Sequence, residues 1–318
     1  MENIAVKVVR KTREALDIAG FELARVDGGA LPAFSAGSHI DVQLPGGLTR
    51  QYSLCNDSGE QHRYRIAVLR DPASRGGSVA MHDKVHEGDV IQISAPRNHF
   101  PLQHAQRSLL FAGGIGVTPL LCMAQRLAAI NADFGMHYAT RSAERTAFRG
   151  EIMASAFANK VSFHHDDGDA AQMLNVPGAL GAFDTGTHIY VCGPGGFINH
   201  VVQVAQGMGW PATHIHLEYF AAAPQDHSAD AAFDVKIAST GKTCTVPAGE
   251  SVVQALAKHG IEILTSCEQG VCGTCITRVL EGEPDHRDLY FTDDEKAKND
   301  QFTPCCSRSR TPVLVLDL

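Results

Sequence analysis

The 318-residue chain lacks the features that mark several large classes of protein. It has no apolar stretch of the roughly 18–20 residues that a bilayer-spanning helix needs, so no transmembrane segment is predicted. Positive charge is in deficit, since 27 Lys and Arg against 35 Asp and Glu give a formal net charge of −8. This balance argues against nucleic acid or an anionic membrane as a partner. Internal repeats and low-complexity tracts are also absent, and the length is comfortable for two or three globular domains.

A secretory signal is missing as well, because the first residues contain no basic segment ahead of a hydrophobic core. Nine cysteines without such a signal indicate a reducing compartment, where thiols bind metals or lie buried rather than form disulfides. We therefore expect a cytoplasmic protein.

Four of these cysteines, Cys267, Cys272, Cys275 and Cys305, are spaced as C-x4-C-x2-C followed by a fourth 30 positions later. That is the spacing of plant-type ferredoxins, in which four thiolates hold a 2Fe–2S cluster. The glycines among them allow a tight loop whose backbone N–H groups point at the sulfurs. A structural zinc site and buried free thiols remain as alternatives, although zinc sites more often use two C-x2-4-C pairs. The spacing predicts an iron–sulfur cluster, which requires a source of electrons elsewhere in the chain.

Two segments of different character precede the cysteines. Residues 4 to about 102 contain short stretches of β-branched and aromatic residues separated by glycine and proline turns, which predicts an antiparallel barrel. From about residue 107 strands alternate with helical patterns, as a parallel α/β sheet requires. The predicted elements are the strands Ile4–Lys11, His39–Leu44, Arg63–Arg70, Asp89–Ser94, Arg107–Ala112, Phe134–Thr140 and His188–Cys192, and the helix Thr118–Ile130.

The third segment follows a small, polar stretch without periodicity, Ala221–Ala232, which is interpreted as a linker. Residues 233–318 then form a module of their own. Its predicted elements are helices with capping boxes at Ser251 and Gln254 and at Thr292 and Glu295, and a closing strand at Pro312–Leu318.

Two motifs in the first segment suggest a flavin site. Arg50–Leu54 would lie on a strand, with Arg50 and Tyr52 on one face and Ser53 on the other. A flavin needs an aromatic ring, donors and a cation of this kind. Arg75–Ser78 would open a helix, and glycines with a hydroxyl at a helix N-terminus bind anions. Taken alone, the first motif is more often strand packing and the second an ordinary glycine turn.

Two motifs in the second segment suggest a dinucleotide site. Phe111–Leu120 runs from a strand through a glycine-rich turn into a helix with Pro119 in its first turn, although it does not match G-x-G-x-x-G. Tyr190–Phe197 places Cys192 at the end of a buried strand, where ligands bind in such sheets. A cysteine there is equally well a small core residue. The acidic and histidine-rich stretch His164–Asp169 is interpreted as a strand end and turn, because it lacks metal-site spacing.

Together and in this order, the motifs and the cysteines resemble the phthalate dioxygenase reductase family, which includes the vanillate O-demethylase reductases. The resemblance covers essentially the whole chain. It implies a multidomain protein with an antiparallel β-barrel flavin domain, a parallel α/β NAD domain and a β-grasp-like α+β ferredoxin domain. The implied bounds of these domains are 1–104, 105–222 and 233–318, with 223–232 as a linker.

The resemblance also implies a function. Electrons would pass from NADH to FMN, then to the 2Fe–2S cluster, and on to a Rieske-type aromatic-ring oxygenase or O-demethylase. Two alternatives remain: a stand-alone NAD(P)H reductase of small acceptors, or a non-enzymatic metal-thiolate interaction protein. The sequence does not name the oxygenase or its substrate, and a monomer is expected.

The resemblance assigns site residues by position. Flavin binding is implied for Arg50, Tyr52, Ser53, Val68, Arg75, Gly76, Gly77, Ser78 and Phe220. NAD binding is implied for Gly113, Gly114, Gly116, Thr118, Thr140, Arg141, Gly193 and Pro194. Catalytic positions beside the reacting rings are implied for Ser53, Thr118 and Cys192, and cluster ligation for Cys267, Cys272, Cys275 and Cys305. Ala221, after Phe220, departs from the glycine usual in the family.

Two assignments are less secure. Arg141 occurs in family members that use NADH, whereas Ser142 and Arg145 leave NADPH open. Cys306 directly follows Cys305, and the offset from Cys275 favours Cys305 as the ligand and Cys306 as a buried thiol. The cysteines that match no motif are interpreted as structural: Cys55, Cys122 and Cys244.

Overall fold

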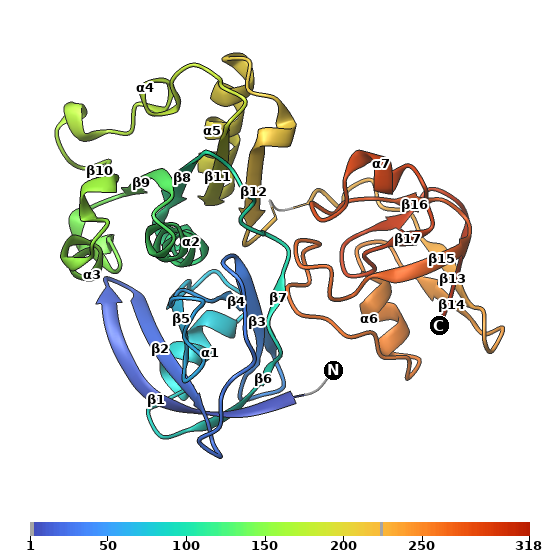
Figure 1. Cartoon of the computed structure of the whole chain (residues 1–318). Helices are drawn as coiled ribbons and strands as arrows, with labels where there is room; N and C mark the ends of the chain where they lie inside the picture. The colour runs from blue at the N-terminus through green and yellow to red at the C-terminus, as the bar shows by residue number, and fades with distance from the viewer. Residues whose placement is uncertain (1–2, 223–224) are drawn as a thin grey trace. The chain divides into compact units, whose positions relative to one another are not determined.

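The computed structural model describes residues 3–222 and 225–318 of the chain (Figure 1). These residues form two compact units, Met1–Phe220 and Ala221–Leu318. The first unit contains two sheets, and the second unit has a core of its own. The predicted linker residues Ala223 and Pro224 lie outside the described residues.

The first sheet of the first unit is antiparallel and curls into a half-barrel (Figure 1). Its strands follow the order β4-β3-β6-β1-β2-β5, and β7 pairs with β3. Alternate side chains such as Val6, Val8, Ile40 and Val42 form its core, which α1 (Gly77–Lys84) helps to fill with Met81. The strands are β1 (Asn3–Ala15), β2 (Ile18–Arg25), β3 (Ser38–Gln43), β4 (Thr49–Ser53), β5 (Tyr64–Leu69), β6 (Val90–Ser94) and β7 (Arg97–Asn98).

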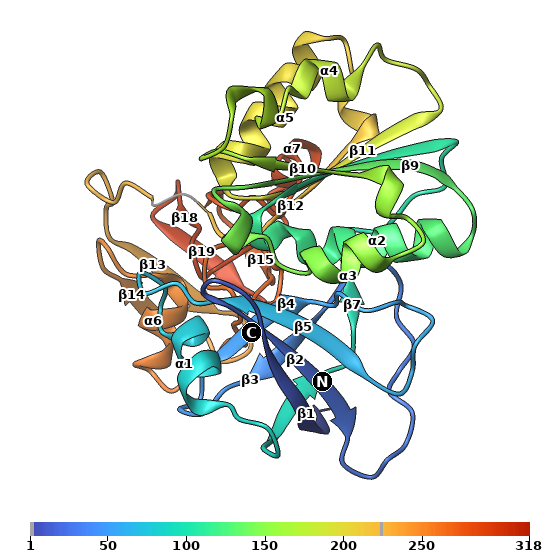
Figure 2. The ribbon, with the colours of Figure 1, turned by 90° about the vertical axis from the view of Figure 1, so that its left-hand side faces the viewer.

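The second sheet of this unit is entirely parallel, in the order β10-β9-β8-β11-β12. Helices cover both of its faces (Figure 2). Helix α2 (Val117–Ala129) shares a core with barrel residues such as Ile18 and Phe100, and α5 (Gly195–Gly207) packs into a separate core with Trp210. The strands are β8 (Arg107–Gly113), β9 (Asp133–Thr140), β10 (Val161–His165), β11 (Thr187–Gly193) and β12 (Ile215–Tyr219).

Short helical elements connect the parallel strands. They are the 3-10 segments η1 (Gly114–Gly116), η2 (Ala143–Arg145), η3 (Ala158–Lys160), η4 (Ala170–Gln172) and η5 (Ala212–His214), and the helices α3 (Arg149–Ala154) and α4 (Val176–Leu180). Because the sheet is parallel, the carboxyl ends of all five strands lie at one edge.

The two sheets of the first unit are joined by polar contacts. Arg65 of β5 forms ion pairs with Glu14 of β1 at 3.2 Å and with Glu151 of α3 at 2.5 Å. Arg145, at the end of η2, pairs with Asp17 at 3.2 Å. The pairs with Glu151 and Asp17 thus fix β5 and the turn between β1 and β2 to the segments that follow β9, whereas the pair with Glu14 lies within the half-barrel.

The second unit is a mixed sheet with the order β14-β13-β19-β15-β17, in which β13 and β19 are parallel. Helix α6 (Val252–Ala257) packs its Val252 and Leu256 into the core of this sheet. This arrangement is the α+β ferredoxin fold that was expected. The remaining elements are β13 (Phe233–Ile237), β14 (Thr243–Val246), β15 (Thr277–Glu281), β16 (Pro284–Asp285), α7 (Asp293–Lys296), β17 (Gln301–Phe302), β18 (Arg308–Ser309) and β19 (Val313–Leu316).

The structure confirms the predicted element types and shifts their ends. Strand β1 continues to Ala15, beyond the predicted Lys11, and accommodates this length with two irregularities in its pairing to β2. Both capping boxes are present, at Ser251 and at Thr292. No helix within the described residues is long and apolar enough to cross a membrane.

Candidate functional site

The predicted flavin-phosphate residues lie together where β4 meets α1. The guanidinium of Arg50 donates to the carbonyl of Arg75 at 3.1 Å. The stem of Arg50 passes directly over Gly77, where an added Cβ would lie 2.5 Å from its Cγ and 2.7 Å from its Nε. Gly76 caps α1 with a φ of 79°, which glycine adopts without strain. The helix therefore begins with its free N–H groups next to two arginines, as an anion site requires.

The other residues of this loop fix its shape. Ser78 Oγ accepts from the backbone N–H of Asp71 at 3.1 Å and contacts Ser74 Oγ at 2.9 Å. His82 of α1 forms a 2.8 Å hydrogen bond with the carbonyl of Val68, which ties the helix to β5. Val68 thus contacts the helix that carries the loop.

Tyr52 and Ser53 lie on β4 as predicted, opposite Ile40 and His39 of β3. Burial raises the pKa of the Tyr52 phenol, so its hydroxyl stays protonated as a hydrogen-bond donor. Phe220 follows the end of β12, and its side chain is 38% exposed.

The predicted dinucleotide turn lies at the carboxyl edge of the parallel sheet. Gly116 approaches the backbone of β11 so closely that an added Cβ would lie 2.6 Å from Gly193 N. Gly113 is similarly crowded, because a Cβ added to it would lie 3.0 Å from Pro194 Cδ and 2.8 Å from Phe197 Cδ1. The glycines of both motifs therefore meet at the ends of β8 and β11, although they are about 80 residues apart in the sequence.

Thr118 and Cys192 are both buried at this edge. The Thr118 hydroxyl donates to the carbonyl of Ile115 at 3.1 Å, which fixes its orientation in the first turn of α2. Burial, reinforced by the nearby Glu218, raises the pKa of the Cys192 thiol well above its usual range. Cys192 is therefore a neutral thiol rather than a nucleophile.

Glu218 belongs to this group, and sequence reasoning missed it. Its carboxylate accepts a hydrogen bond from Ser53 Oγ at 3.4 Å, across the junction of the two sheets. Burial raises the pKa of Glu218 to about 8, and the bond from Ser53 offsets only part of this effect. The only signal in the sequence was its position two residues before Phe220.

Thr140 and Arg141 follow the next strand, β9. Thr140 is buried, and its hydroxyl contacts His165 Nδ1 at 3.0 Å. The backbone N–H of Asp166 donates to the carbonyl of Thr140, and that of Asp167 to the carbonyl of Arg141, both at 3.1 Å. The acidic turn after β10 is therefore fixed beside Arg141. The histidines before it end a strand, as predicted.

The four predicted ligand cysteines converge in one buried loop of the second unit. The Cys267 thiol contacts those of Cys272 and Cys305, and Cys305 also contacts Cys275. Backbone N–H groups point at two of the sulfurs. Those of Gln269 and Val271 each donate to Cys267 Sγ at 3.4 Å, and that of Thr274 donates to Cys272 Sγ at 3.5 Å. The mutual contacts of these thiols lower the pKa of Cys267 and raise those of Cys272 and Cys305, because closely spaced thiols ionise one after another.

This loop fits a 2Fe–2S cluster. Gly270 and Gly273 have φ of 72° and 69°, so glycine is required at both turns. The described residues contain no group of three or more His, Cys, Asp or Glu side chains arranged to hold one metal ion. A 2Fe–2S cluster has a different requirement, since it divides four thiolates between two irons.

The neighbouring Cys306 is not part of the thiol group of the first three cysteines. Its sulfur contacts the Cys305 thiol, Thr303 Oγ1 at 3.2 Å and Ser307 Oγ at 3.8 Å, and packs against Gly270. Cys305 therefore has the position of a ligand and Cys306 that of a neighbour.

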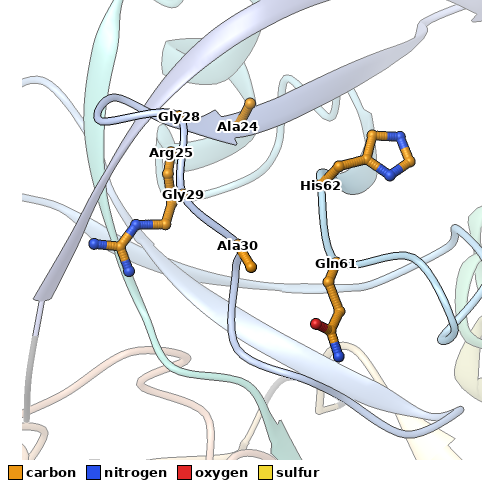
Figure 3. A pocket seen from close by; sticks show the side chains of 7 residues that line it. All are labelled: Ala24, Arg25, Gly28, Gly29, Ala30, Gln61 and His62. Carbon is orange, nitrogen blue, oxygen red and sulfur yellow. The ribbon is translucent and has the colours of Figure 1, made fainter.

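A separate hollow of about 360 Å³ lies on the half-barrel (Figure 3). It is lined by Ala24, Arg25, Gly28, Gly29, Ala30, Gln61 and His62. None of the predicted site residues borders it, so it is not the candidate cofactor site.

Comparison with known proteins finds relatives over nearly the whole chain. A family model of the 2Fe-2S iron-sulfur cluster binding domain matches residues 235–310, and one of the N-terminal domain of dimethylamine monooxygenase subunit DmmA-like proteins matches residues 97–215. A vanillate O-demethylase oxidoreductase of Pseudomonas sp. is 57% identical over 96% of both chains. A phthalate 4,5-dioxygenase oxygenase reductase subunit of Pseudomonas putida is 41% identical over 98% of this chain and 96% of its own.

Among solved structures, that of phthalate dioxygenase reductase is 39% identical, covers 99% of this chain and 98% of its own, and has a TM-score of 0.78. Its title describes electron transfer from pyridine nucleotides to 2Fe–2S. The chain belongs to this family of reductases. It is an oxidoreductase whose cofactors are FMN, NADH and a 2Fe–2S cluster.

Proposed function

We propose that this chain is the NADH-dependent reductase component of a multicomponent oxygenase or O-demethylase. The observation that carries the proposal is that one chain contains three sites. These are the N-terminus of α1 beside two arginines, the glycines at the carboxyl ends of β8 and β11, and the four cysteines of the second unit. When bound, the flavin accepts an electron pair from the nicotinamide and releases single electrons, which the iron–sulfur cluster relays.

The residues of the half-barrel would bind and orient the flavin. Arg50 and Arg75, with the N-terminus of α1 between them, would hold its phosphate. Tyr52 would lie against the ring system, while Ser53 would donate a hydrogen bond to it. Phe220 would cover the ring from the end of β12.

The parallel sheet would bind the dinucleotide. Gly113, Gly114 and Gly116 would let the pyrophosphate approach the N-terminus of α2, and Thr118 and Cys192 would flank the nicotinamide. As a buried neutral thiol, Cys192 would exclude water without taking the hydride.

The end of β9 favours NADH over NADPH. Arg145, one candidate for a 2′-phosphate, is already paired with Asp17 at 3.2 Å. The acidic turn Asp166–Asp167 is bonded along the backbone to Thr140 and Arg141, and would repel the additional phosphate. Gly193 and Pro194, opposite the glycine turn, would complete the dinucleotide contacts.

We propose the same domain bounds as those implied by the sequence: a flavin domain in 1–104, an NAD domain in 105–222, a linker in 223–232 and a ferredoxin domain in 233–318. The electron acceptor would be an oxygenase of the Rieske type that acts on an aromatic compound, and the reductase would act as a cytoplasmic monomer. Nine cysteines without a disulfide support a reducing compartment.

An anaerobic titration of the purified protein with NADH tests this proposal. We expect flavin and iron–sulfur absorption to bleach in stages with about three electrons per chain, two for a flavin and one for a 2Fe–2S cluster. A colourless protein after anaerobic reconstitution would overturn the proposal. Bleaching with NADPH alone would overturn the choice of nucleotide.

The partner is tested by adding a purified Rieske-type oxygenase with an aromatic substrate and measuring oxygen uptake. Uptake that depends on both the reductase and NADH supports the assignment. Fast reduction of quinones with no electron transfer to any oxygenase would favour the stand-alone reductase instead.

A further inference from the structure

Tyr290 lies against the loop that carries the cluster ligands. Gly273 stands between Cys272 and Cys275, and a Cβ added to it would lie 2.5 Å from Cζ and 2.9 Å from Oη of Tyr290. An atom of the glycine backbone is therefore in contact with the aromatic ring. The φ of 69° at Gly273 belongs to the same turn, so both the backbone conformation and the ring exclude any larger residue.

A buried carboxylate holds Tyr290 in this place. Asp288, whose side chain is fully buried, accepts hydrogen bonds at Oδ2 from the backbone N–H groups of Tyr290 at 3.1 Å and Phe291 at 2.8 Å. The intervening residue Leu289 donates its N–H to the carbonyl of Gly270 at 3.0 Å. The segment 288–291 is thereby fixed to the cluster loop at both of its glycines.

The ring of Tyr290 also packs against the next residue in the chain, Phe291. Phe291, which is buried, meets Tyr290 edge to face with ring centroids 5.2 Å apart. Leu289, by contrast, directs its side chain outward and is 49% exposed. Of the two adjacent side chains, the aromatic one packs on the ligand loop and the aliphatic one does not.

We propose that Tyr290 is the residue that shields the iron–sulfur cluster from water, a positioning role that deepens and rests on the proposed function. Solvent exposure is one of the factors that set the potential of such clusters. The reduced cluster carries one more negative charge than the oxidised one, and water stabilises the more highly charged state. By excluding water, the Tyr290 ring keeps the potential low, and it limits the access of oxygen to the sulfurs.

The test is an electrochemical titration of the cluster in the full-length holoprotein, with mediators and without NADH, in wild type and three variants. Tyr290→Ser removes the ring, Tyr290→Phe removes only the hydroxyl, and Leu289→Ser alters the exposed neighbour. We expect a positive shift of the midpoint potential and a severalfold faster bleaching in air for Tyr290→Ser. Tyr290→Phe and Leu289→Ser should match the wild type.

An unchanged potential in Tyr290→Ser would overturn the proposal, and so would a shift in Tyr290→Phe as large as that in Tyr290→Ser, because the hydroxyl would then be the active group. If Tyr290→Ser fails to retain its cluster, Tyr290→Leu replaces it in the test, because leucine keeps part of the volume of the ring. It should give a smaller positive shift of the midpoint potential, and an unchanged potential would also refute the shielding role of Tyr290. A wild-type protein without iron–sulfur absorption would instead refute the proposed function.

Discussion

Ser53 Oγ, at the last residue of β4, donates a hydrogen bond to the carboxylate of Glu218 on β12 at 3.4 Å. This contact joins the half-barrel to the parallel sheet, close to the residues proposed to bind the flavin and the nicotinamide. Glu218 is half-buried, and burial raises the pKa of its carboxyl to about 8. At neutral pH Glu218 is therefore mainly protonated and adds little negative charge beside the proposed flavin.

The pKa of Glu218 predicts how stability depends on pH. In the unfolded chain this carboxyl titrates near 4.5, whereas the folded protein retains the proton up to about pH 8. Between these values the folded state binds more protons, so the free energy of unfolding falls as pH rises. Glu218→Gln cannot titrate, so it should not lose stability in this way. Between pH 5 and pH 8.5 its free energy of unfolding should rise relative to that of the wild type, on the order of 2 kcal/mol after allowance for partial exposure.

Thermal unfolding of wild type and Glu218→Gln across this pH range measures the difference. Glu144→Gln, at an exposed carboxylate of the same unit, serves as the control for the loss of one carboxylate. If Glu218→Gln follows the wild-type curve at every pH, the carboxyl titrates normally in the folded protein.

The two adjacent cysteines at the end of the ferredoxin unit should respond differently to substitution. Cys305 contacts the ligand thiols of Cys267 and Cys275, whereas Cys306 contacts Cys305 and Thr303 and packs on Gly270. Cys305→Ser should lose most of the iron–sulfur absorption, since a hydroxyl is a much poorer iron ligand than a thiolate. Cys306→Ser should retain it.

Iron content and visible absorption of the two variants after anaerobic purification decide this prediction. Retention of a normal cluster in Cys305→Ser together with its loss in Cys306→Ser would reverse the ligand assignment. The flavin absorption serves as an internal control, because it depends on the other unit and should be the same in both.

The sequence was a good guide where the signal is local. The capping boxes at Ser251 and Thr292, and the glycine turn that ends β8, depend on residues within a few positions, and the structure confirms them. The cysteine spacing is also local for three of the four residues. A resemblance carried by such motifs therefore gave the fold class correctly.

Contacts between distant segments could not be predicted in this way. Ser53 and Glu218 are 165 residues apart, and Glu218 has no motif of its own. Tyr290 is similar, because its position on Gly273 depends on the hydrogen bonds of Asp288 and on the fold of the whole unit. Nothing in the local sequence distinguishes Tyr290, on the loop, from Leu289, at the surface.

Gly116 should tolerate no side chain. Its φ of −61° is open to any residue, so the restriction is purely steric: an added Cβ would lie 2.6 Å from Gly193 N and closer still to the carbonyl of Cys192. Gly116→Ala must displace the turn between β8 and α2 from the end of β11, at a cost of about 1–3 kcal/mol. We expect a loss of roughly tenfold or more in NADH affinity, corresponding to about 1.4 kcal/mol, with flavin content unchanged.

NADH binding and thermal unfolding of the flavin-loaded protein measure these two effects. Gly135→Ala is a matched control on β9, since the nearest atom to its added Cβ, Leu109 Cδ2, lies at an ordinary 3.6 Å. Normal NADH affinity in Gly116→Ala would show that the dinucleotide does not use the edge where these strands meet.

The two ion pairs of Arg65 should contribute unequally to stability, one with Glu14 inside the half-barrel and one with Glu151 of α3. The side chains of Arg65 and Glu14 are each 13% exposed, whereas Glu151 is 37% exposed. An exposed pair contributes about 0–1 kcal/mol, and removing one member of a buried pair costs about 3–5 kcal/mol because the other charge is left without a partner. Arg65→Met should therefore lose about 3 kcal/mol of stability, mainly through Glu14.

A double-mutant cycle separates the two pairs. Glu14→Gln should recover much of the stability that Arg65→Met loses, because it removes the unpaired charge, while Glu151→Gln should recover little. Arg65 also lies over the ring of Phe148 at 4.6 Å, a contact that methionine partly replaces, so the cycle reports mainly on charge. Equal coupling to both carboxylates would mean that the shorter contact to Glu151 compensates for its exposure. In that case the distance between the charges, rather than their burial, would govern how much each ion pair contributes to the free energy of unfolding.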